Sequence, residues 1–183
     1  HVADDEAVEP EELQKYINQY LPEDIAVTGV VAAGERFHSR LNATGKTYEY
    51  HLIPYGTYDV FARKYAWQMT EPLDIEAMRE AAGHVLGSHD FRGFCTKAAK
   101  KKSTIRTIRL LEIYETKNEI VIEITGNGFL YNMVRILVGT LVEVGMGLRK
   151  ADDIPTILEK KERRYAGETA PACGLFLKQI YYE

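Results

Sequence analysis

The spacing of apolar residues divides the chain into short strands and helices that follow one another in a mixed order. Alternating apolar and polar positions predict strands at residues 25–31, 37–41, 46–53, 105–115, 119–125 and 175–182. Apolar residues three or four positions apart predict helices at residues 10–21, 74–86 and 128–148, with a further short helix around Pro155. Strands and helices do not alternate strictly, so we expect an α+β fold with helices packed on an antiparallel or mixed sheet.

Turn and cap residues indicate where several of these elements begin and end. Asp74 is expected to cap the helix that follows it, and Gly87 to end that helix. The Asn-Ala-Thr-Gly segment at 42–45 predicts a turn between the strands at 37–41 and 46–53. Lys117 and Asn118 predict a hairpin between the strands at 105–115 and 119–125.

The predicted strand at 46–53 has two chemically different faces. Tyr48, Tyr50 and Leu52 point to one side, and the residues between them point to the other. A tyrosine on such a strand is most often a core residue whose hydroxyl is bonded by the backbone. The alternative for Tyr48 is stacking on a nucleic-acid base, since tyrosines beside a basic stretch bind bases in this way.

Arg135 is the only formally charged residue between Gly126 and Val142. The helix around it is apolar on nearly all sides, which is typical of a buried helix. Arg135 and Glu143 interrupt the apolar run before it reaches the length of a membrane span. A buried guanidinium is costly unless it is paired, so we expect an anionic partner, either a carboxylate or an RNA phosphate. A purely structural ion pair and a side chain that reaches solvent are the alternatives.

Charge is distributed unevenly along the chain. The formal net charge of the 183 residues is −4, which argues against a uniformly basic nucleic-acid binder. Residues 1–24 hold eight acidic residues and one basic residue, whereas residues 92–109 hold seven basic residues and no acidic one. This basic stretch is the expected place for phosphate contacts, with a solvated lysine-rich loop as the alternative.

Cysteine and histidine spacing excludes several classes of site. The two cysteines, Cys95 and Cys173, form no CxxC pair, and the five histidines have no zinc-binding spacing. No phosphate-binding glycine loop or nucleophile elbow occurs, so a metal or a nucleotide cofactor is not expected. No signal peptide is visible, and we expect a cytoplasmic protein without a membrane segment.

Six segments together resemble the tRNA pseudouridine synthases that modify the anticodon arm. They occur in the order of that family and extend from about Leu21 to the end of the chain: RFHSR at 36–40, KTYEY at 46–50, LGSHDF at 86–91, STIRTI at 103–108, NGFLYNMVRILVG at 127–139 and APACGLFL at 170–177. Each segment is weakly specific by itself, but six in order are specific. The resemblance implies a pseudouridine synthase-like fold and the isomerisation of uridine 38, 39 or 40 of tRNA to pseudouridine, without a cofactor or metal.

The resemblance also implies roles for individual residues. Tyr48 would stack on the flipped uracil and accept the C5 proton directly or through water. Arg135 would pair with a nucleophilic aspartate and keep it ionised. Leu175 would line the base pocket. The remaining implied contacts to the substrate are made by Arg40, Lys46, Lys97, Lys100, Lys101, Lys102 and Arg106.

The family's nucleophilic aspartate stands in a Gly-Arg-Thr-Asp motif that does not occur in these 183 residues. The resemblance therefore implies that residues 1–183 are the C-terminal part of the enzyme and that the N-terminal half of the fold is absent. The acidic, helical residues 1–24 would belong to the end of that half. Such a chain is expected to bind tRNA without isomerising uridine.

The resemblance implies a homodimer that binds the tRNA anticodon arm. Two other functions are compatible with the residues. One is a tRNA-binding module without catalytic activity. The other is an α+β scaffold that binds protein partners through its acidic first helix.

Overall fold

The computed structural model of the chain describes residues 8–96 and 103–182. They belong to two compact units, one within residues 1–42 and one within residues 43–183. The second unit carries the sheet and most of the helices. It has the predicted α+β architecture with a mixed sheet, and the prediction of fold class is confirmed. Whether a further half of the fold exists stays a prediction.

The first unit contains one helix and no strand among its described residues. Helix α1 (Pro10–Asn18) begins with a proline and two glutamates in its first turn, which suit the positive end of the helix dipole. It ends three residues earlier than predicted.

The strands predicted at 25–31 and 37–41 are wrong. The amide of Val27 donates to the side-chain oxygen of Asn18 at 2.8 Å, and the Val27 carbonyl accepts from the Asn18 amide nitrogen at 2.9 Å. A side chain of the preceding helix thus takes the place of a partner strand. Residues 38–42 close on themselves as a turn, in which the Asn42 amide donates to the His38 carbonyl at 3.0 Å.

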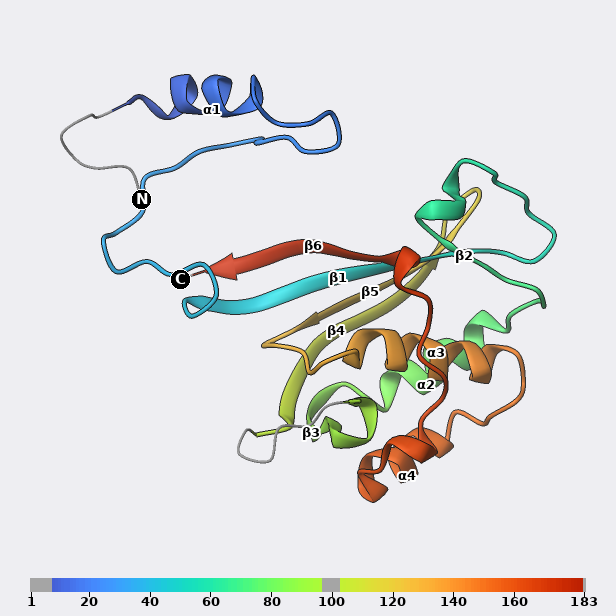
Figure 1. Cartoon of the computed structure of the whole chain (residues 1–183). Helices are drawn as coiled ribbons and strands as arrows, with labels where there is room; N and C mark the ends of the chain where they lie inside the picture. Colours follow the sequence, from blue (N-terminus) through green and yellow to red (C-terminus); the bar gives the residue numbers. More distant parts are fainter. Residues whose placement is uncertain (1–7, 97–102, 183) are drawn as a thin grey trace. The chain divides into compact units, whose positions relative to one another are not determined.

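A six-stranded sheet forms the frame of the second unit (Figure 1). Its strands are β1 (Ala43–Ile53), β2 (Trp67–Gln68), β3 (Gly87–Asp90), β4 (Ile105–Glu115), β5 (Ile120–Gly126) and β6 (Leu175–Tyr182). Strand β1 is central, because β5 pairs with one of its edges and β6 with the other. Strands β4 and β3 extend the sheet beyond β5, and all these pairs are antiparallel. The short β2 pairs with the end of β1 in parallel.

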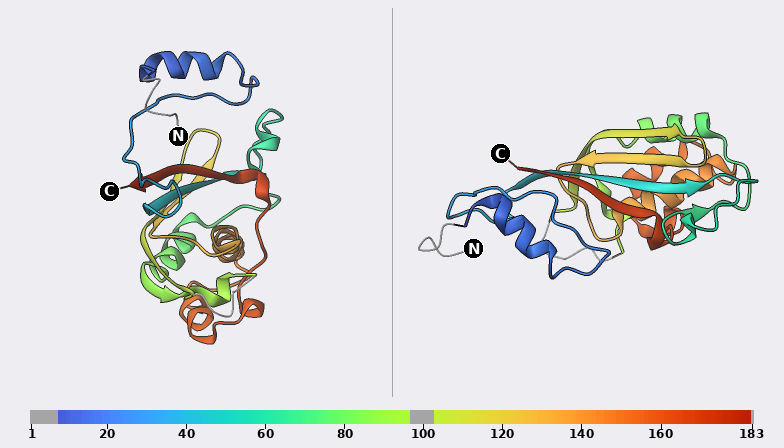
Figure 2. Two further views of the ribbon diagram at one scale, coloured as in Figure 1. Left: turned by 60° about the vertical axis from the view of Figure 1, so that its left-hand side comes forward. Right: turned by 90° about the horizontal axis from the view of Figure 1, so that it is seen from above.

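Three helices of this unit lie on the same face of the sheet, as Figures 1 and 2 show. They are α2 (Ile75–Gly83), α3 (Met133–Gly145) and α4 (Asp153–Lys160). Helix α3 is buried along most of its length, as its composition predicts, and it packs against α2 and the sheet. The Asp74 side chain caps α2 by accepting from the Ala77 amide at 3.0 Å, as predicted. Four 3-10 turns complete the described chain: η1 (Ala62–Lys64), η2 (Phe91–Phe94), η3 (Arg163–Tyr165) and η4 (Ala172–Gly174).

The element boundaries agree with the predictions where long apolar patterns set them. Strands β4 and β6 have the predicted bounds, and the hairpin between β4 and β5 is confirmed. The turn predicted at 42–45 is wrong, since residues 43–45 already pair with β6 as part of β1. Gly87 does not end α2; it begins β3 with a positive φ of 92°. Helix α3 is shorter than the predicted 128–148 because residues 128–132 lead into it as a loop.

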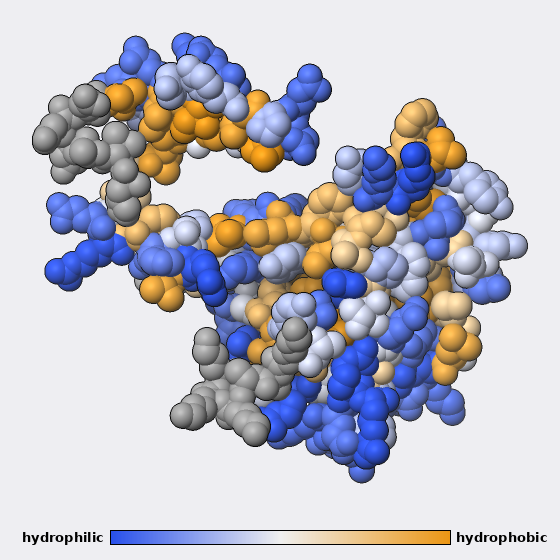
Figure 3. Space-filling model, in the orientation of Figure 1, coloured by the Kyte–Doolittle hydropathy of each residue, from blue (hydrophilic) through white to orange (hydrophobic). Residues whose placement is uncertain are grey.

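The surface in Figure 3 is hydrophilic around α4 and apolar along part of β6. Phe176 and Leu177 of β6 are 37% and 48% exposed. Within residues 8–96 and 103–182, no helix has the length and apolar character needed to cross a membrane. In the same residues, no group of three metal-binding side chains is found, and Cys95 and Cys173 are both free thiols.

Candidate active site

Tyr48 lies in the middle of the sheet, on the face that the helices cover. It is opposite Ile124 of β5 and Leu177 of β6, so both edges of its backbone are paired. Its half-buried ring packs edge-on against Phe129, with ring centroids 5.3 Å apart. The sheet and the loop before α3 therefore fix the position of this ring.

Burial raises the pKa of the Tyr48 hydroxyl above its usual value near 10. The phenol therefore keeps its proton at neutral pH. A neutral phenol donates one hydrogen bond and accepts through its oxygen lone pairs, and it is a weak base. A proton that leaves a substrate at this position would therefore pass to a water molecule bound by the hydroxyl and would not stay on the phenol.

Arg135 projects from the first turn of α3 and is held by two oxygens. Its Nε donates to the Ala170 carbonyl at 2.7 Å, and its Nη1 donates to the side-chain oxygen of Asn132 at 3.4 Å. In return, the Ala170 amide donates to the Arg135 carbonyl at 3.1 Å. The side chain is half-buried. Helix α3 and the segment at Ala170 are thereby joined at this residue.

The predicted anionic partner of Arg135 is not among the described residues, which supply only neutral oxygens. Its Nη2 has no hydrogen bond to any described residue and is not a buried, unsatisfied atom. This side of the guanidinium is therefore reachable from solvent. A carboxylate or phosphate approaching from that side would find a charged donor that is already oriented.

Leu175 and Lys46 lie close to Tyr48 along the strands. Leu175 is the residue of β6 directly opposite Tyr50 of β1, and it packs against the same core as Tyr48. Lys46 lies two positions before Tyr48 and so shares its face of β1. Thr47 points to the opposite face, where its hydroxyl contacts those of Thr125 at 2.7 Å and Tyr181 at 3.0 Å.

The basic residues predicted to bind tRNA are only partly described. Arg106 of β4 is half-buried, and it donates to the backbone carbonyls of Ser103 and Ile105. It lies near Gly128, in the loop that leads to Phe129 and α3. Arg40 is exposed in the first unit. The predicted contacts at Lys97, Lys100, Lys101 and Lys102 lie outside the described residues.

Three residues next to Tyr48 and Arg135 are missed by the sequence reasoning. Phe129 packs on Tyr48, and Asn132 accepts from Arg135 while adopting a left-handed conformation with φ of 61°. The Asn132 amide nitrogen also donates to Thr96 at 3.2 Å. The sequence pattern predicts an ordinary core residue at Tyr50, but its hydroxyl donates to the Pro171 carbonyl at 2.7 Å. An asparagine directly before an apolar helix is the one signal in the sequence that points to such a conformation.

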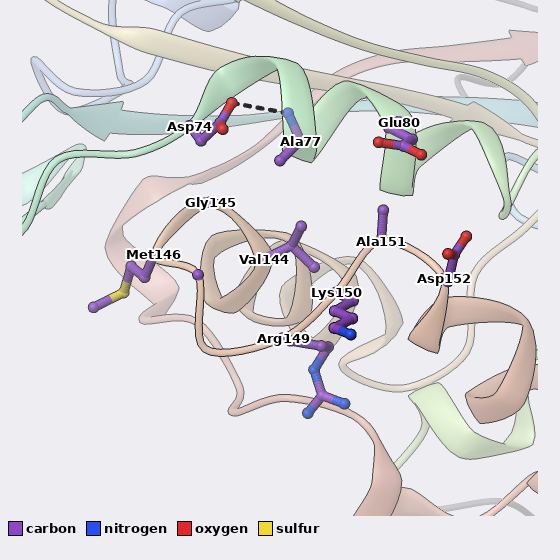
Figure 4. Close-up of a pocket in the computed structure, with 11 residues that line it drawn as sticks. Asp74, Ala77, Glu80, Val144, Gly145, Met146, Arg149, Lys150, Ala151 and Asp152 are labelled. Atoms are coloured by element: carbon purple, nitrogen blue, oxygen red, sulfur yellow. Dashed lines mark hydrogen bonds between the residues drawn. The ribbon is translucent and has the colours of Figure 1, made fainter.

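A separate cavity of about 540 Å³ lies where the start of α2 meets the end of α3 (Figure 4). Side chains of both signs line it, namely Asp74, Glu80, Arg149, Lys150 and Asp152. Arg149 is already paired with Glu143 at 2.8 Å. Gly145, at this end of α3, is ten residues from Arg135, or about 15 Å along the helix axis. The cavity is therefore distinct from the surroundings of Tyr48 and Arg135.

Comparison with known proteins identifies the family of the chain. Residues 81–183 match the family model described as tRNA pseudouridine synthase. A protein named tRNA pseudouridine synthase A 2 from Bacillus cereus is 43% identical over 178 residues, which cover 97% of this chain and 73% of that protein. Another, named tRNA pseudouridine synthase A 1 from the same species, is 45% identical over 166 residues, covering 91% of this chain and 67% of that protein. A relative from Bacillus anthracis, also named tRNA pseudouridine synthase A 2, is 43% identical over 178 residues, covering 97% of this chain and 73% of that protein.

The fold and these relatives place the chain among the RNA-modifying isomerases. The chain belongs to the tRNA pseudouridine synthase family.

Proposed function

We propose that this chain forms part of an enzyme that converts uridine to pseudouridine in tRNA, and that Tyr48 and Arg135 act in the reaction. One observation carries the proposal: in a chain of this family, β1 and α3 bring the tyrosine of KTYEY and the arginine of the apolar helix to one face of the sheet. The substrate we propose is uridine 38, 39 or 40 in the anticodon arm. The proposed cellular form is a cytoplasmic homodimer.

The proposed reaction rearranges bonds without net change of atoms. The bond between C1′ and N1 breaks, the uracil turns, and a bond forms between C1′ and C5. C5 then gives up its proton and N1 takes one up. The uridine must leave its stack before this chemistry, which is why the site needs a flat side chain on which the base can rest.

Tyr48 has two parts in the proposed reaction. Its ring, held against Phe129, provides the surface on which the flipped uracil stacks. Its hydroxyl positions a bound water that takes up the C5 proton, because the neutral phenol is too weak a base to hold that proton itself. Leu175 lines the pocket beside the base, and Lys46 and Arg106 contact the tRNA backbone.

Arg135 holds the nucleophilic aspartate in the proposed reaction. The family's Gly-Arg-Thr-Asp motif is not among the 183 residues, so the proposal places this carboxylate outside them. The carboxylate would meet the guanidinium from the side of Nη2, because Nε and Nη1 are already bonded. The positive guanidinium lowers the pKa of an aspartate paired with it, so the carboxylate stays ionised at neutral pH and is ready to attack.

The test uses tRNA labelled with tritium at C5 of its uridines and a protein that carries these residues together with the Gly-Arg-Thr-Asp segment. We expect tritium release from positions 38 to 40. Tyr48→Phe and Arg135→Ala should each slow release by about 100-fold or more while tRNA binding is kept. Tyr114→Phe is the matched control, since its hydroxyl contacts Glu49 on the other face of the sheet.

Four outcomes would contradict parts of the proposal. Full activity of Tyr48→Phe would remove the hydroxyl from the mechanism. Release by the 183 residues alone would show that no external aspartate is needed. Salt-dependent tRNA binding without any release would indicate a binding module, and the absence of binding would favour a protein scaffold.

A further inference from the structure

Two neighbouring backbone carbonyls receive hydrogen bonds from two different elements of the second unit. The Ala170 carbonyl accepts from Arg135 Nε of α3 at 2.7 Å. The next carbonyl along the chain, that of Pro171, accepts from the Tyr50 hydroxyl of β1 at 2.7 Å. The segment that carries both carbonyls leads through η4 into β6 (Figure 1). It therefore connects the sheet to the arginine on the helix.

Tyr50 is a rigid support for this segment. Its side chain is completely buried, and its ring packs edge-on against Trp67 with centroids 6.4 Å apart. Gly174 lies against the same ring so closely that a Cβ atom there would come within 2.8 Å of it. The hydroxyl therefore has almost no freedom to follow the Pro171 carbonyl if the segment shifts.

The link between the two carbonyls is also stiff. The Ala170–Pro171 peptide plane contains the Ala170 carbonyl, the proline nitrogen and the proline Cα. The ring fixes the φ of Pro171, which is −52°, so only its ψ, here 150°, separates this plane from the next carbonyl. Fixing the Pro171 carbonyl thus leaves the Ala170 carbonyl little room to rotate.

Close packing on the helix side completes the arrangement. A Cβ atom at Gly139 of α3 would lie 2.0 Å from the Glu168 carbonyl, so the segment lies directly on the helix backbone. The Ala170 amide bonds back to the Arg135 carbonyl at 3.1 Å. The acceptor for Arg135 Nε is therefore fixed from the sheet by Tyr50 and from the helix by its own backbone.

We propose that Tyr50 is a positioning residue that sets the orientation of the Arg135 guanidinium through the Ala170–Pro171 segment. The role of Arg135 itself rests on the proposed function above. Tyr50 touches neither substrate nor the reacting atoms. It fixes the carbonyl that accepts from Nε. This in turn sets the direction in which the other guanidinium nitrogens point toward a carboxylate.

The kinetic test removes only the hydroxyl, with Tyr50→Phe, in a protein that includes the aspartate segment. We expect kcat to fall about tenfold with KM for tRNA unchanged, because the base and backbone contacts remain. Tyr114→Phe, which removes a hydroxyl on the opposite sheet face, should leave both values unchanged. Arg135→Lys keeps the charge but lacks Nε, so adding Tyr50→Phe to it should lower kcat no further. Additive losses would overturn the proposal.

A second measurement needs neither tRNA nor catalysis. The Arg135 Nε–H signal in the NMR spectrum of the 183-residue chain can be assigned by its loss in Arg135→Lys. Its hydrogen exchange should be slow in the parent chain and at least about tenfold faster in Tyr50→Phe, because the acceptor is no longer fixed. Unchanged exchange would overturn the proposal even if Arg135 proves to have no part in catalysis.

Pro171→Ala gives an independent variant if Tyr50→Phe does not fold. Residue 171 is exposed, so the substitution removes the fixed φ without opening a cavity. We expect faster Nε–H exchange and a lower kcat than in the parent, with Pro155→Ala on α4 as the matched control. If Pro171→Ala has the same Nε–H exchange rate and the same kcat as the parent, Pro171 does not hold the two carbonyls in a fixed relation.

Discussion

Adjacent residues of β1 serve different purposes because successive side chains of a strand point to opposite faces. Tyr48 faces the helices and packs on Phe129, whereas Thr47 faces away and is 1% exposed. The Thr47 hydroxyl lies 2.7 Å from that of Thr125 and 3.0 Å from that of Tyr181. The KTYEY motif therefore combines a candidate catalytic side chain with one that only joins β1 to its neighbours.

Thr47→Val tests this division of roles at a single residue. Valine has nearly the same shape, so the change removes a hydroxyl without leaving a cavity. We expect the free energy of unfolding to fall by about 1 to 3 kcal/mol, because two hydrogen bonds of the hydroxyl are lost, with tRNA turnover unchanged. Urea denaturation and tritium release measure the two quantities. A loss of turnover with normal stability would assign Thr47 to the site.

At the scale of elements, the approach of residues 168–171 to helix α3 depends on Gly139. The Glu168 carbonyl occupies the space where any side chain at residue 139 would begin. Glycine usually weakens a helix interior, and here it permits contact between two backbones. The reciprocal bonds between Arg135 and Ala170 form at this contact.

Gly139→Ala should consequently destabilise the protein, whereas Gly83→Ala should not. Gly139→Ala forces α3 and the Glu168 backbone apart, which costs about 2 kcal/mol or more in a packed interior. Gly83 is the last residue of α2 and has open space around its Cα. Its replacement should raise the free energy of unfolding by up to about 1 kcal/mol through helix propensity. Equal effects in thermal unfolding would refute the close-contact explanation.

At the scale of the whole molecule, ionisable side chains on the sheet make stability depend on pH. The Lys178 ammonium, 2.8 Å from Glu49, holds the pKa of that carboxyl below its usual value. The pair therefore adds to the free energy of unfolding at pH values above the pKa of an unfolded glutamate, about 4.3. This stabilisation is lost as pH falls through the pKa of Glu49 in the folded protein. Burial raises the pKa of Tyr48 and of Tyr50. Their contribution is present below about pH 10 and is lost as pH rises above it.

We therefore expect stability to be nearly constant from about pH 5 to 9 and to fall on both sides. Urea midpoints measured across this range provide the test. Glu49→Gln should reduce the acid-side loss, and Tyr50→Phe should reduce the alkaline-side loss. If Glu49→Gln loses as much stability at acid pH as the parent, the Lys178–Glu49 pair does not cause that loss. Glu76→Gln, at an exposed residue of α2, is the matched control.

The sequence alone determined the elements whose apolar pattern is long and complete. Strands β4 and β6 have the predicted bounds, because both segments are rich in the β-branched, leucine and aromatic residues that favour strands. The buried helix α3 and the cap at Asp74 follow from local chemistry in the same way. The family, and with it the predicted roles of Tyr48 and Arg135, also came from local motifs.

Tertiary structure decided what depends on a distant partner. Gly87–Asp90 becomes β3 only because β4 pairs with it, while residues 25–31 show strand-like alternation but pair with the Asn18 side chain instead. The oxygens that hold Arg135 come from Asn132 and from Ala170, 35 residues away. The connection from Tyr50 through Pro171 to that arginine joins three separate segments. A pattern along the chain records which residues are buried, but only the fold determines which distant atoms meet.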